Sequence, residues 1–190
     1  MNRPRDLPLF AWGEALRAAR ARRHRARRYA VWLSLGTLAL GSTILFPPPP
    51  RLLWNATASA PVGFYLVSPG AWLARGDMVV ARAPYPARLL AARRHYLPMN
   101  VPLVKRVVGV PGDIICARGD RVTLDGRLIA RRLLHDSMGR TLPWWEGCEG
   151  LLPGRYFLLM DNVPASFDGR YFGPVGESDI IGKARLLWLR

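Results

Sequence analysis

The chain has 190 residues, enough for one ordinary domain with a terminal extension, and only two cysteines, which excludes a fold stapled by several disulfides. Its formal net charge is +15 at pH 7, but residues 1–28 alone hold nine arginines against Asp6 and Glu14. About half of the excess charge therefore lies in one short arm, a pattern typical of a membrane-topology signal and not of a nucleic-acid-binding face.

Residues 29–46 form the first predicted element, an 18-residue segment without a charged side chain. As a helix it spans about 27 Å, close to the thickness of a bilayer core. The preceding arginines predict residues 1–28 in the cytoplasm, a single transmembrane anchor over 29–46 and a β-rich domain over 47–190 across the membrane. In a Gram-negative bacterium the anchor would lie in the inner membrane and the domain in the periplasm. Two alternatives stay open, a buried core helix and a cleaved signal peptide, because the residues around Ser59 have the small-x-small pattern of a cleavage site.

The rest of the chain is typical of short strands separated by turns. Four prolines at 47–50 cannot continue a helix and predict a stiff extended spacer. Apolar runs rich in valine, isoleucine and aromatic residues predict strands over 63–68, 77–83, 102–110, 112–117, 155–160 and 180–189. An Asp-Gly pair predicts a hairpin over 122–130. The fold class is therefore mainly β, a small barrel or sandwich of antiparallel strands, with one helix around 87–95 and a long polar connection over 131–150.

Two segments supply a candidate nucleophile and base. Ser59 is flanked by alanines, which leave its hydroxyl and backbone N–H open to a substrate. On the strand predicted over 102–110, Lys105 shares a face with Leu103 and Val107. Burial lowers the pKa of a lysine, so a buried Lys105 can accept a proton from a serine, whereas an arginine cannot. A lysine that snorkels at a strand edge is the alternative.

A third segment, residues 160–175, holds Ser166, Asp168 and Arg170 at alternate positions of a stretch that we expect to be extended. Asp168 and Arg170 can form an ion pair, and Ser166 can hydrogen-bond near the lysine. The two histidines beyond the anchor stand in no motif, and the cysteines have no metal-ligand spacing. A histidine base, a metal site and a cofactor are therefore not expected.

In this order after one N-terminal anchor, the three segments resemble the boxes of the type I signal peptidase family. They are most similar to its conjugative-transfer branch, the TraF-type peptidases that mature a plasmid pilin. The resemblance rests on the run N-x-T-x-S-x-P-x-G-x-Y, which begins at Asn55, and on S-F-D-x-R-Y-F-G-P-V, which begins at Ser166. It implies Ser59 as the nucleophile and Lys105 as the general base. It also implies that the Thr57 hydroxyl assists the backbone N–H of Ser59 in an oxyanion hole.

The resemblance further implies that Ser166 orients the lysine and that Asp168 and Arg170 form a supporting salt bridge. The chain departs from the family at two positions. Ala60 stands where the common bacterial leader peptidases carry methionine, and Gly169 stands where the family has a serine between its aspartate and arginine.

The function that this resemblance implies is a membrane-anchored serine endopeptidase that works at the lipid bilayer. Its substrate would be an exported, membrane-tethered precursor, a conjugative propilin, with plain cleavage and cyclisation both open. The alternatives are a general signal peptidase I, a non-enzymatic envelope scaffold protein and a cytosolic self-cleaving Ser–Lys protein. No nucleic-acid partner is expected. Cys116 and Cys148 either pair, as an oxidising compartment allows, or remain buried thiols.

Overall fold

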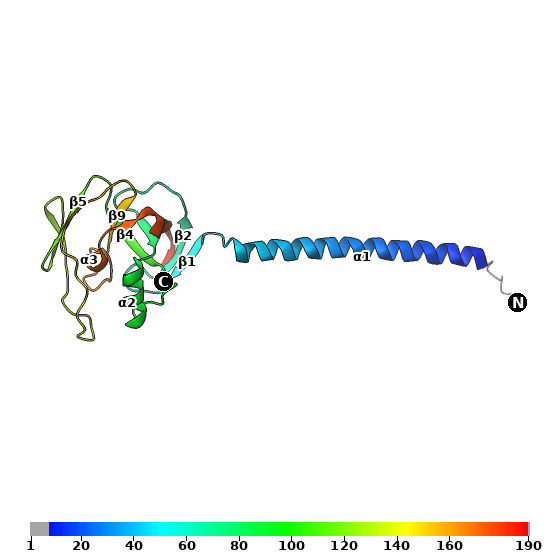
Figure 1. The fold of residues 1–190 in the computed structure, drawn as a ribbon, viewed down its shortest axis with the longest axis horizontal. Helices are drawn as coiled ribbons and strands as arrows, with labels where there is room; N and C mark the ends of the chain where they lie inside the picture. Colours follow the sequence, from blue (N-terminus) through cyan, green and yellow to red (C-terminus); the bar gives the residue numbers. More distant parts are fainter. Residues whose placement is uncertain (1–7, 190) are drawn as a thin grey trace. The chain divides into compact units, whose positions relative to one another are not determined.

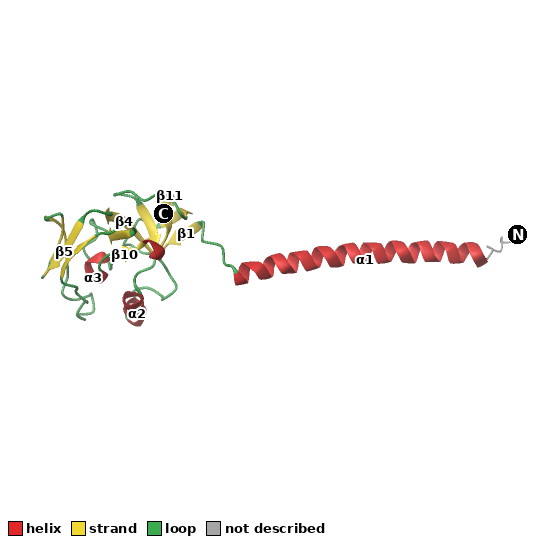
Figure 2. Ribbon diagram, turned by 45° about the horizontal axis from the view of Figure 1, so that its top comes forward, coloured by secondary structure: helices red, strands yellow, loops and turns green. Residues whose placement is uncertain are grey.

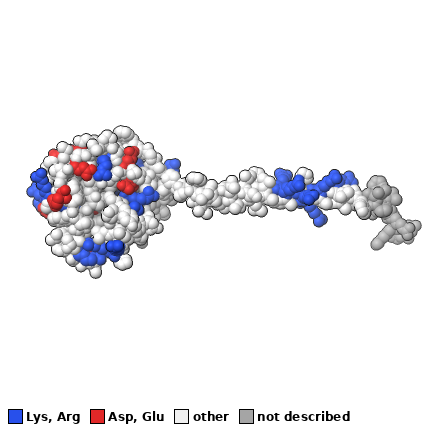
Figure 3. All heavy atoms as spheres, in the orientation of Figure 1, with Lys and Arg blue, Asp and Glu red and all other residues white. Residues whose placement is uncertain are grey.

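The computed structural model describes residues 8–189, which divide into two compact units at the Pro48–Pro49 bond. The first unit contains helix α1, Pro8–Leu45 (Figure 1). The charged side chains of α1 gather toward its N-terminal half, and its C-terminal part is uncharged (Figure 3). Over residues 8–189, no helix combines the length and the apolar character needed to cross a membrane. The predicted transmembrane anchor over 29–46 is helical up to Leu45, but its membrane-spanning character is not confirmed.

The second unit contains two antiparallel sheets, drawn as arrows in Figure 2. The larger sheet has the strand order β1 (Leu52–Asn55), β2 (Gly63–Ser68), β11 (Ile180–Leu189), β3 (Met78–Ala81), β4 (Leu103–Gly109), β9 (Arg155–Leu159) and β10 (Val175–Gly176). The smaller sheet has the order β7 (Arg127–Arg131), β6 (Arg121–Leu124), β5 (Ile114–Arg118) and β8 (Gly147–Gly150). The helical segments are α2 (Tyr85–Arg93), α3 (Gly169–Phe172) and a 3₁₀ turn over Glu177–Asp179. The predicted mainly β fold of antiparallel strands is confirmed.

Alternation of side chains explains how the strands build the core. In β2, Tyr65 and Val67 are buried, whereas Phe64 and Ser68 are exposed and Leu66 is partly buried, as expected for a strand with one face on the core. The two sheets share a cluster in which Phe157 and Leu159 of β9 pack with apolar residues of β5 and β6. Strand β4, which carries Lys105, lies between β3 and β9 inside the larger sheet, so its backbone is fixed on both sides.

The structure confirms most predicted elements, contains short strands that were not predicted and corrects the expectation for one stretch. The Asp125-Gly126 turn joins β6 to β7 with positive φ at both residues, the geometry that hairpins favour. The polar connection over 131–150 ends in strand β8, which was not predicted and pairs with β5. The stretch over 160–175 is not extended throughout. The Asp168 side chain accepts a hydrogen bond from Arg170 N and so begins the short helix α3.

Candidate active site

The loop after β1 is shaped by Asn55, a buried residue at the end of that strand. Its Nδ2 donates to the carbonyl oxygens of Thr57 (3.0 Å), Ala60 (3.1 Å) and Pro61 (3.1 Å). Its Oδ1 accepts from the Thr57 backbone N–H at 3.2 Å and from the Thr57 hydroxyl at 2.7 Å. One side chain therefore holds both ends of a tight loop and presents Ser59 at its tip.

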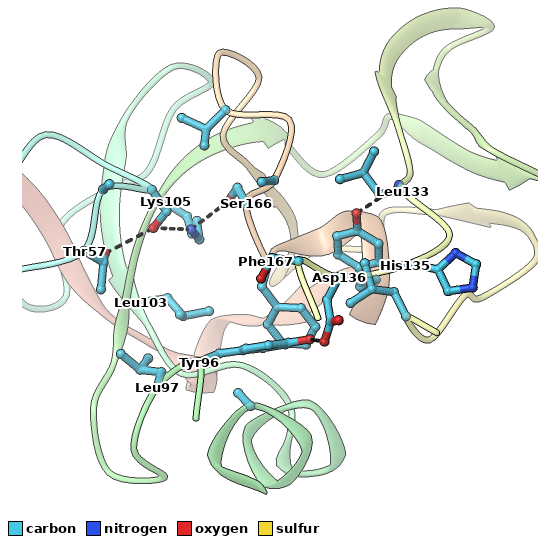
Figure 4. Close-up of a pocket in the computed structure, with 18 of the residues that line it drawn as sticks. Thr57, Tyr96, Leu97, Leu103, Lys105, Leu133, His135, Asp136, Ser166 and Phe167 are labelled. Atoms are coloured by element: carbon cyan, nitrogen blue, oxygen red, sulfur yellow. Dashed lines mark hydrogen bonds between the residues drawn. The ribbon is translucent and has the colours of Figure 1, made fainter. Parts of the chain in front are cut away.

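Ser59, Lys105 and Ser166 meet although they come from three distant parts of the chain (Figure 4). Lys105 Nζ lies 3.0 Å from Ser59 Oγ and 2.9 Å from Ser166 Oγ. Lys105 is only 1% exposed. The snorkelling alternative for this lysine is therefore wrong, because its amine lies inside the protein against two hydroxyls.

Burial lowers the pKa of Lys105 to about 8, because the desolvated site disfavours the ammonium ion. The negative charge of Asp168 acts in the opposite direction, and the positive charge of Arg170 lowers the pKa further. With a pKa near 8, about a tenth of the amine is neutral at pH 7, compared with less than a thousandth for an ordinary lysine. The neutral amine has a lone pair that can accept the Ser59 proton while an N–H still donates to Ser166.

Asp168 and Arg170 form a buried, two-pronged ion pair behind the lysine. Arg170 Nε and Nη2 each lie 2.9 Å from a different oxygen of Asp168, and the two residues are 2% and 0% exposed. The Arg170 guanidinium also donates to the carbonyl oxygens of Met160 (2.8 Å), Val163 (2.7 Å) and Pro164 (3.0 Å). This pair therefore fixes the loop that leads into Ser166.

Gly169, between the two partners of this pair, packs directly on β9. A Cβ there would lie 2.7 Å from the carbonyl oxygen of Leu158 and 2.8 Å from a ring carbon of Phe157. Neither atom can move away without displacing the strand or a buried ring. Glycine at this position is thus required by the close approach of the backbone to β9, and a serine would not fit the observed packing.

In Figure 4, Thr57 and Ser166 lie on opposite sides of the Lys105 amine. The Thr57 hydroxyl oxygen is 3.2 Å from Ser59 Oγ and donates to Asn55 Oδ1, which fixes the orientation of the side chain. A hydroxyl held at this position is close to where negative charge develops when Ser59 attacks a carbonyl.

A cavity of about 370 Å³ opens beside Ser59 and Lys105. Figure 4 shows Thr57 and Lys105 on one side of it and Leu133, His135 and Asp136 on the other. The far wall comes from two segments that the sequence did not mark, the α2–β4 connection with Tyr96 and the β7–β8 connection with Leu133 to Leu142. No motif signals these residues, since they meet only in the folded chain.

Cys116 of β5 and Cys148 of β8 form a disulfide, so the paired state is observed and not the pair of buried thiols. They face each other in the register of the two strands. The bond attaches β8, and with it the end of the β7–β8 connection, to the middle of the smaller sheet.

The model of the family described as signal peptidase, peptidase S26, matches residues 25–189. A conjugal transfer protein TraF of Agrobacterium fabrum is 32% identical over 144 residues, 69% of this chain and 78% of that protein. A plasmid transfer protein TraF of Escherichia coli is 31% identical over 161 residues, 80% of this chain and 84% of that protein. Signal peptidase I V of Bacillus subtilis is 33% identical over 95 residues, 45% of this chain and 56% of that protein. The chain belongs to the signal peptidase family, peptidase S26, and is a serine peptidase.

Proposed function

We propose that this chain is an endopeptidase that uses Ser59 as nucleophile and Lys105 as general base to process an exported protein precursor. The observation that carries the proposal is the buried amine of Lys105, 3.0 Å from Ser59 Oγ and with its pKa lowered to about 8 by burial. Burying a lysine amine costs stability, and strongly perturbed pKa values gather at functional sites, so the contact of this amine with a serine on an open cavity supports a catalytic role.

The geometry supports a sequence of proton transfers between these two residues. Neutral Lys105 accepts the Ser59 proton as Oγ attacks the scissile carbonyl, and the ammonium then donates that proton to the leaving amine. Ser166 accepts a hydrogen bond from Nζ and so keeps the lone pair aimed at Ser59. We assign the oxyanion to the Ser59 backbone N–H and to the Thr57 hydroxyl, which must turn its proton from Asn55 Oδ1 toward the developing charge. A second nucleophile, water or a substrate amine, then attacks the carbonyl of the acyl-Ser59 ester. Neutral Lys105 takes the proton of this nucleophile and returns it to Ser59 Oγ as the ester bond breaks.

We further propose a conjugative propilin as the substrate, because two of the relatives reported above are named as conjugal or plasmid transfer proteins. Such a precursor lies at the membrane, and the uncharged segment 29–46 after an arginine-rich arm is our reason to place the enzyme there as well. A general signal-peptide substrate is the second candidate, on account of the Bacillus subtilis relative.

Processing in cells tests the proposal. Co-expressed with a propilin or with a signal-peptide precursor, the wild-type chain is expected to convert one of them to its mature form. Ser59→Ala and Lys105→Ala should leave the precursor intact, because each removes one partner of the proton transfer. Ser178→Ala, at an exposed serine outside the cavity, is the matched control. Processing by both active-site variants would refute the mechanism, and alkaline extraction of the same membranes shows whether the chain is anchored.

The lowered pKa of Lys105 predicts the pH dependence of cleavage. Because the neutral amine is the active form, kcat/KM should rise about tenfold per pH unit below pH 7, bend near pH 8 and level off above pH 9. Initial rates on one peptide from pH 5 to 10 measure this profile. A rate that is flat across this range, or that falls above pH 7, would contradict a lysine base.

A further inference from the structure

Helix α2 and the residues just before it carry a cluster of positive charge, and we propose that this cluster binds an acidic stretch of the precursor chain, several residues away from the bond that is cut. The cluster, which we call the α2 basic face, consists of Arg82, Arg88 and Arg93. The inference rests on the proposed function and adds a second contact through which the enzyme selects its substrate.

The charge of the α2 basic face is not neutralised by the protein itself. Residues 78–112 hold six basic residues and no aspartate or glutamate. Arg94 is paired with Asp136, but none of the three arginines of the face forms an ion pair within residues 8–189. In Figure 3, basic side chains gather at the lower edge of the second unit, where Figure 1 shows α2, and no acidic side chain lies among them. Such a surface attracts a partner of opposite charge.

The periodicity of α2 explains how these side chains are presented. Ala87 and Ala91 are buried and mark the inward side of the helix. At about 100° per residue, Arg93 projects from the side opposite to them and Arg88 from the flank. Arg93 is accordingly exposed and Arg88 partly buried, and Arg82, ahead of the helix, is exposed as well. A partner can therefore reach Arg82 and Arg93 without any change in the packing of α2.

Arg88 is the member of the face whose hydrogen-bonding groups are least satisfied. Its Nε is buried and has no hydrogen-bond partner in the part of the chain that the structure describes. The guanidinium carbon lies 5.9 Å from the centroid of the Tyr85 ring, and the side chain lines a narrow cleft with Pro98 and Val101. A guanidinium held partly out of water without a counter-ion favours a carboxylate, which accepts two of its N–H groups at once.

The inward side of α2 belongs to the wall of the cavity that contains Ser59 and Lys105. Ala91 of α2 and Tyr96 just after it line that cavity, and Figure 4 shows α2 as the coiled ribbon below Tyr96. A helix with its side chains is about 10–12 Å across, so the path from the catalytic pair over α2 to its outward side is on the order of 15–25 Å. An extended chain rises about 3.3 Å per residue, which places the acidic stretch about four to eight residues from the cut bond.

Peptides with a charged block test the inference on the full chain in a non-ionic detergent. These internally quenched peptides span the bond that is cut in a precursor processed by the wild-type chain. They carry four glutamates or four glutamines about six residues from that bond, on one side or the other. On one of the two sides, the glutamate block should raise kcat/KM about 3- to 10-fold over the glutamine block, through a lower KM. This gain should disappear as the salt concentration is raised from about 50 mM to about 1 M.

Substitution of the two exposed arginines locates this preference. Arg82→Gln combined with Arg93→Gln should bring the glutamate-to-glutamine ratio close to one and leave kcat/KM for the glutamine peptide unchanged. The charge-reversed pair, Arg82→Glu with Arg93→Glu, should instead favour a block of four lysines, which a merely structural role of these arginines would not produce.

The matched control removes the same amount of charge from another part of the domain. Arg118 and Arg121 of the smaller sheet are exposed and line a separate cleft, away from Ser59 and Lys105. Arg118→Gln combined with Arg121→Gln should therefore keep the wild-type ratio.

The outcomes separate this inference from the proposed function. Ser59-dependent cleavage at equal rates with the glutamate and glutamine blocks on both sides would overturn the inference and leave the peptidase mechanism intact. The same holds if the Arg82→Gln, Arg93→Gln variant keeps the wild-type ratio. If that variant loses activity only in vesicles that contain phosphatidylglycerol, the face binds lipid and the inference is wrong. If no precursor is processed, or if processing persists in Ser59→Ala, the proposed function and the inference fail together.

Discussion

Lys105→Arg is expected to reduce cleavage by about 10³-fold or more, although it keeps the positive charge. A guanidinium does not lose its proton at any pH at which the protein is folded, so it cannot accept the Ser59 proton. The variant should show no recovery of rate as the pH rises toward 10. Initial rates at pH 7 and pH 10, with folding checked by circular dichroism, measure the effect.

The chain offers a matched control for this substitution, because Lys183 is its second and last lysine. Lys183 Nζ lies 2.8 Å from an oxygen of Asp77, and its side chain is 43% exposed. Lys183→Arg keeps that surface ion pair and should leave the rate and its pH profile unchanged. Turnover by Lys105→Arg at more than a few per cent of the wild-type rate would rule out the proposed base.

Arg170→Met is expected to lower the free energy of unfolding by about 3–5 kcal/mol. The substitution leaves the buried carboxylate of Asp168 without its partner and removes the donors to three carbonyl oxygens of the loop before Ser166. In any folded fraction, the pKa of Lys105 should also rise, because Arg170 lowers it and Asp168 raises it. The pH–rate profile should therefore move to higher pH as well.

The control for Arg170→Met is the same change at Arg155, whose ion pair with Glu149 lies on the surface. Their side chains are 38% and 41% exposed, so Arg155→Met should cost no more than about 1 kcal/mol. Denaturant titrations followed by tryptophan fluorescence compare the two variants. Equal losses would mean that the buried pair does not support the fold, and an Arg170→Met profile with an unshifted midpoint would mean that it does not act on Lys105.

The parts of the fold that could be predicted are those whose signals are local. Strand β2 was predicted at its observed bounds, and β11 likewise, because alternating and β-branched residues mark a strand without reference to its partner. Strand β1 was not predicted, since its four residues are too few for a pattern and exist as a strand only through pairing with β2. Helix α3 was missed because its start depends on one capping side chain, that of Asp168, inside a stretch of alternating polar residues.

The candidate site also has residues that could be predicted from the sequence and residues that could not. Five residues could be named together because each stands in a motif of the family that the sequence resembles. The structure places these five in one cluster: Ser59, Lys105, Ser166, Asp168 and Arg170. The role of Asn55 in shaping the loop was not predicted, although asparagine commonly bonds backbone groups two residues on. The far wall of the cavity could not be predicted, because Tyr96 and Asp136 are forty residues apart and meet through tertiary contacts alone.

The Cys116–Cys148 bond has a practical consequence for anyone who handles this protein. It closes a loop of 32 residues, for which chain-entropy estimates give about 3–5 kcal/mol of stabilisation. Most of the far cavity wall lies within that loop. Material prepared with dithiothreitol, or made in a reducing cytosol, would therefore lack the clamp on this wall. Preparations should be compared for free thiol content before their selectivities are compared.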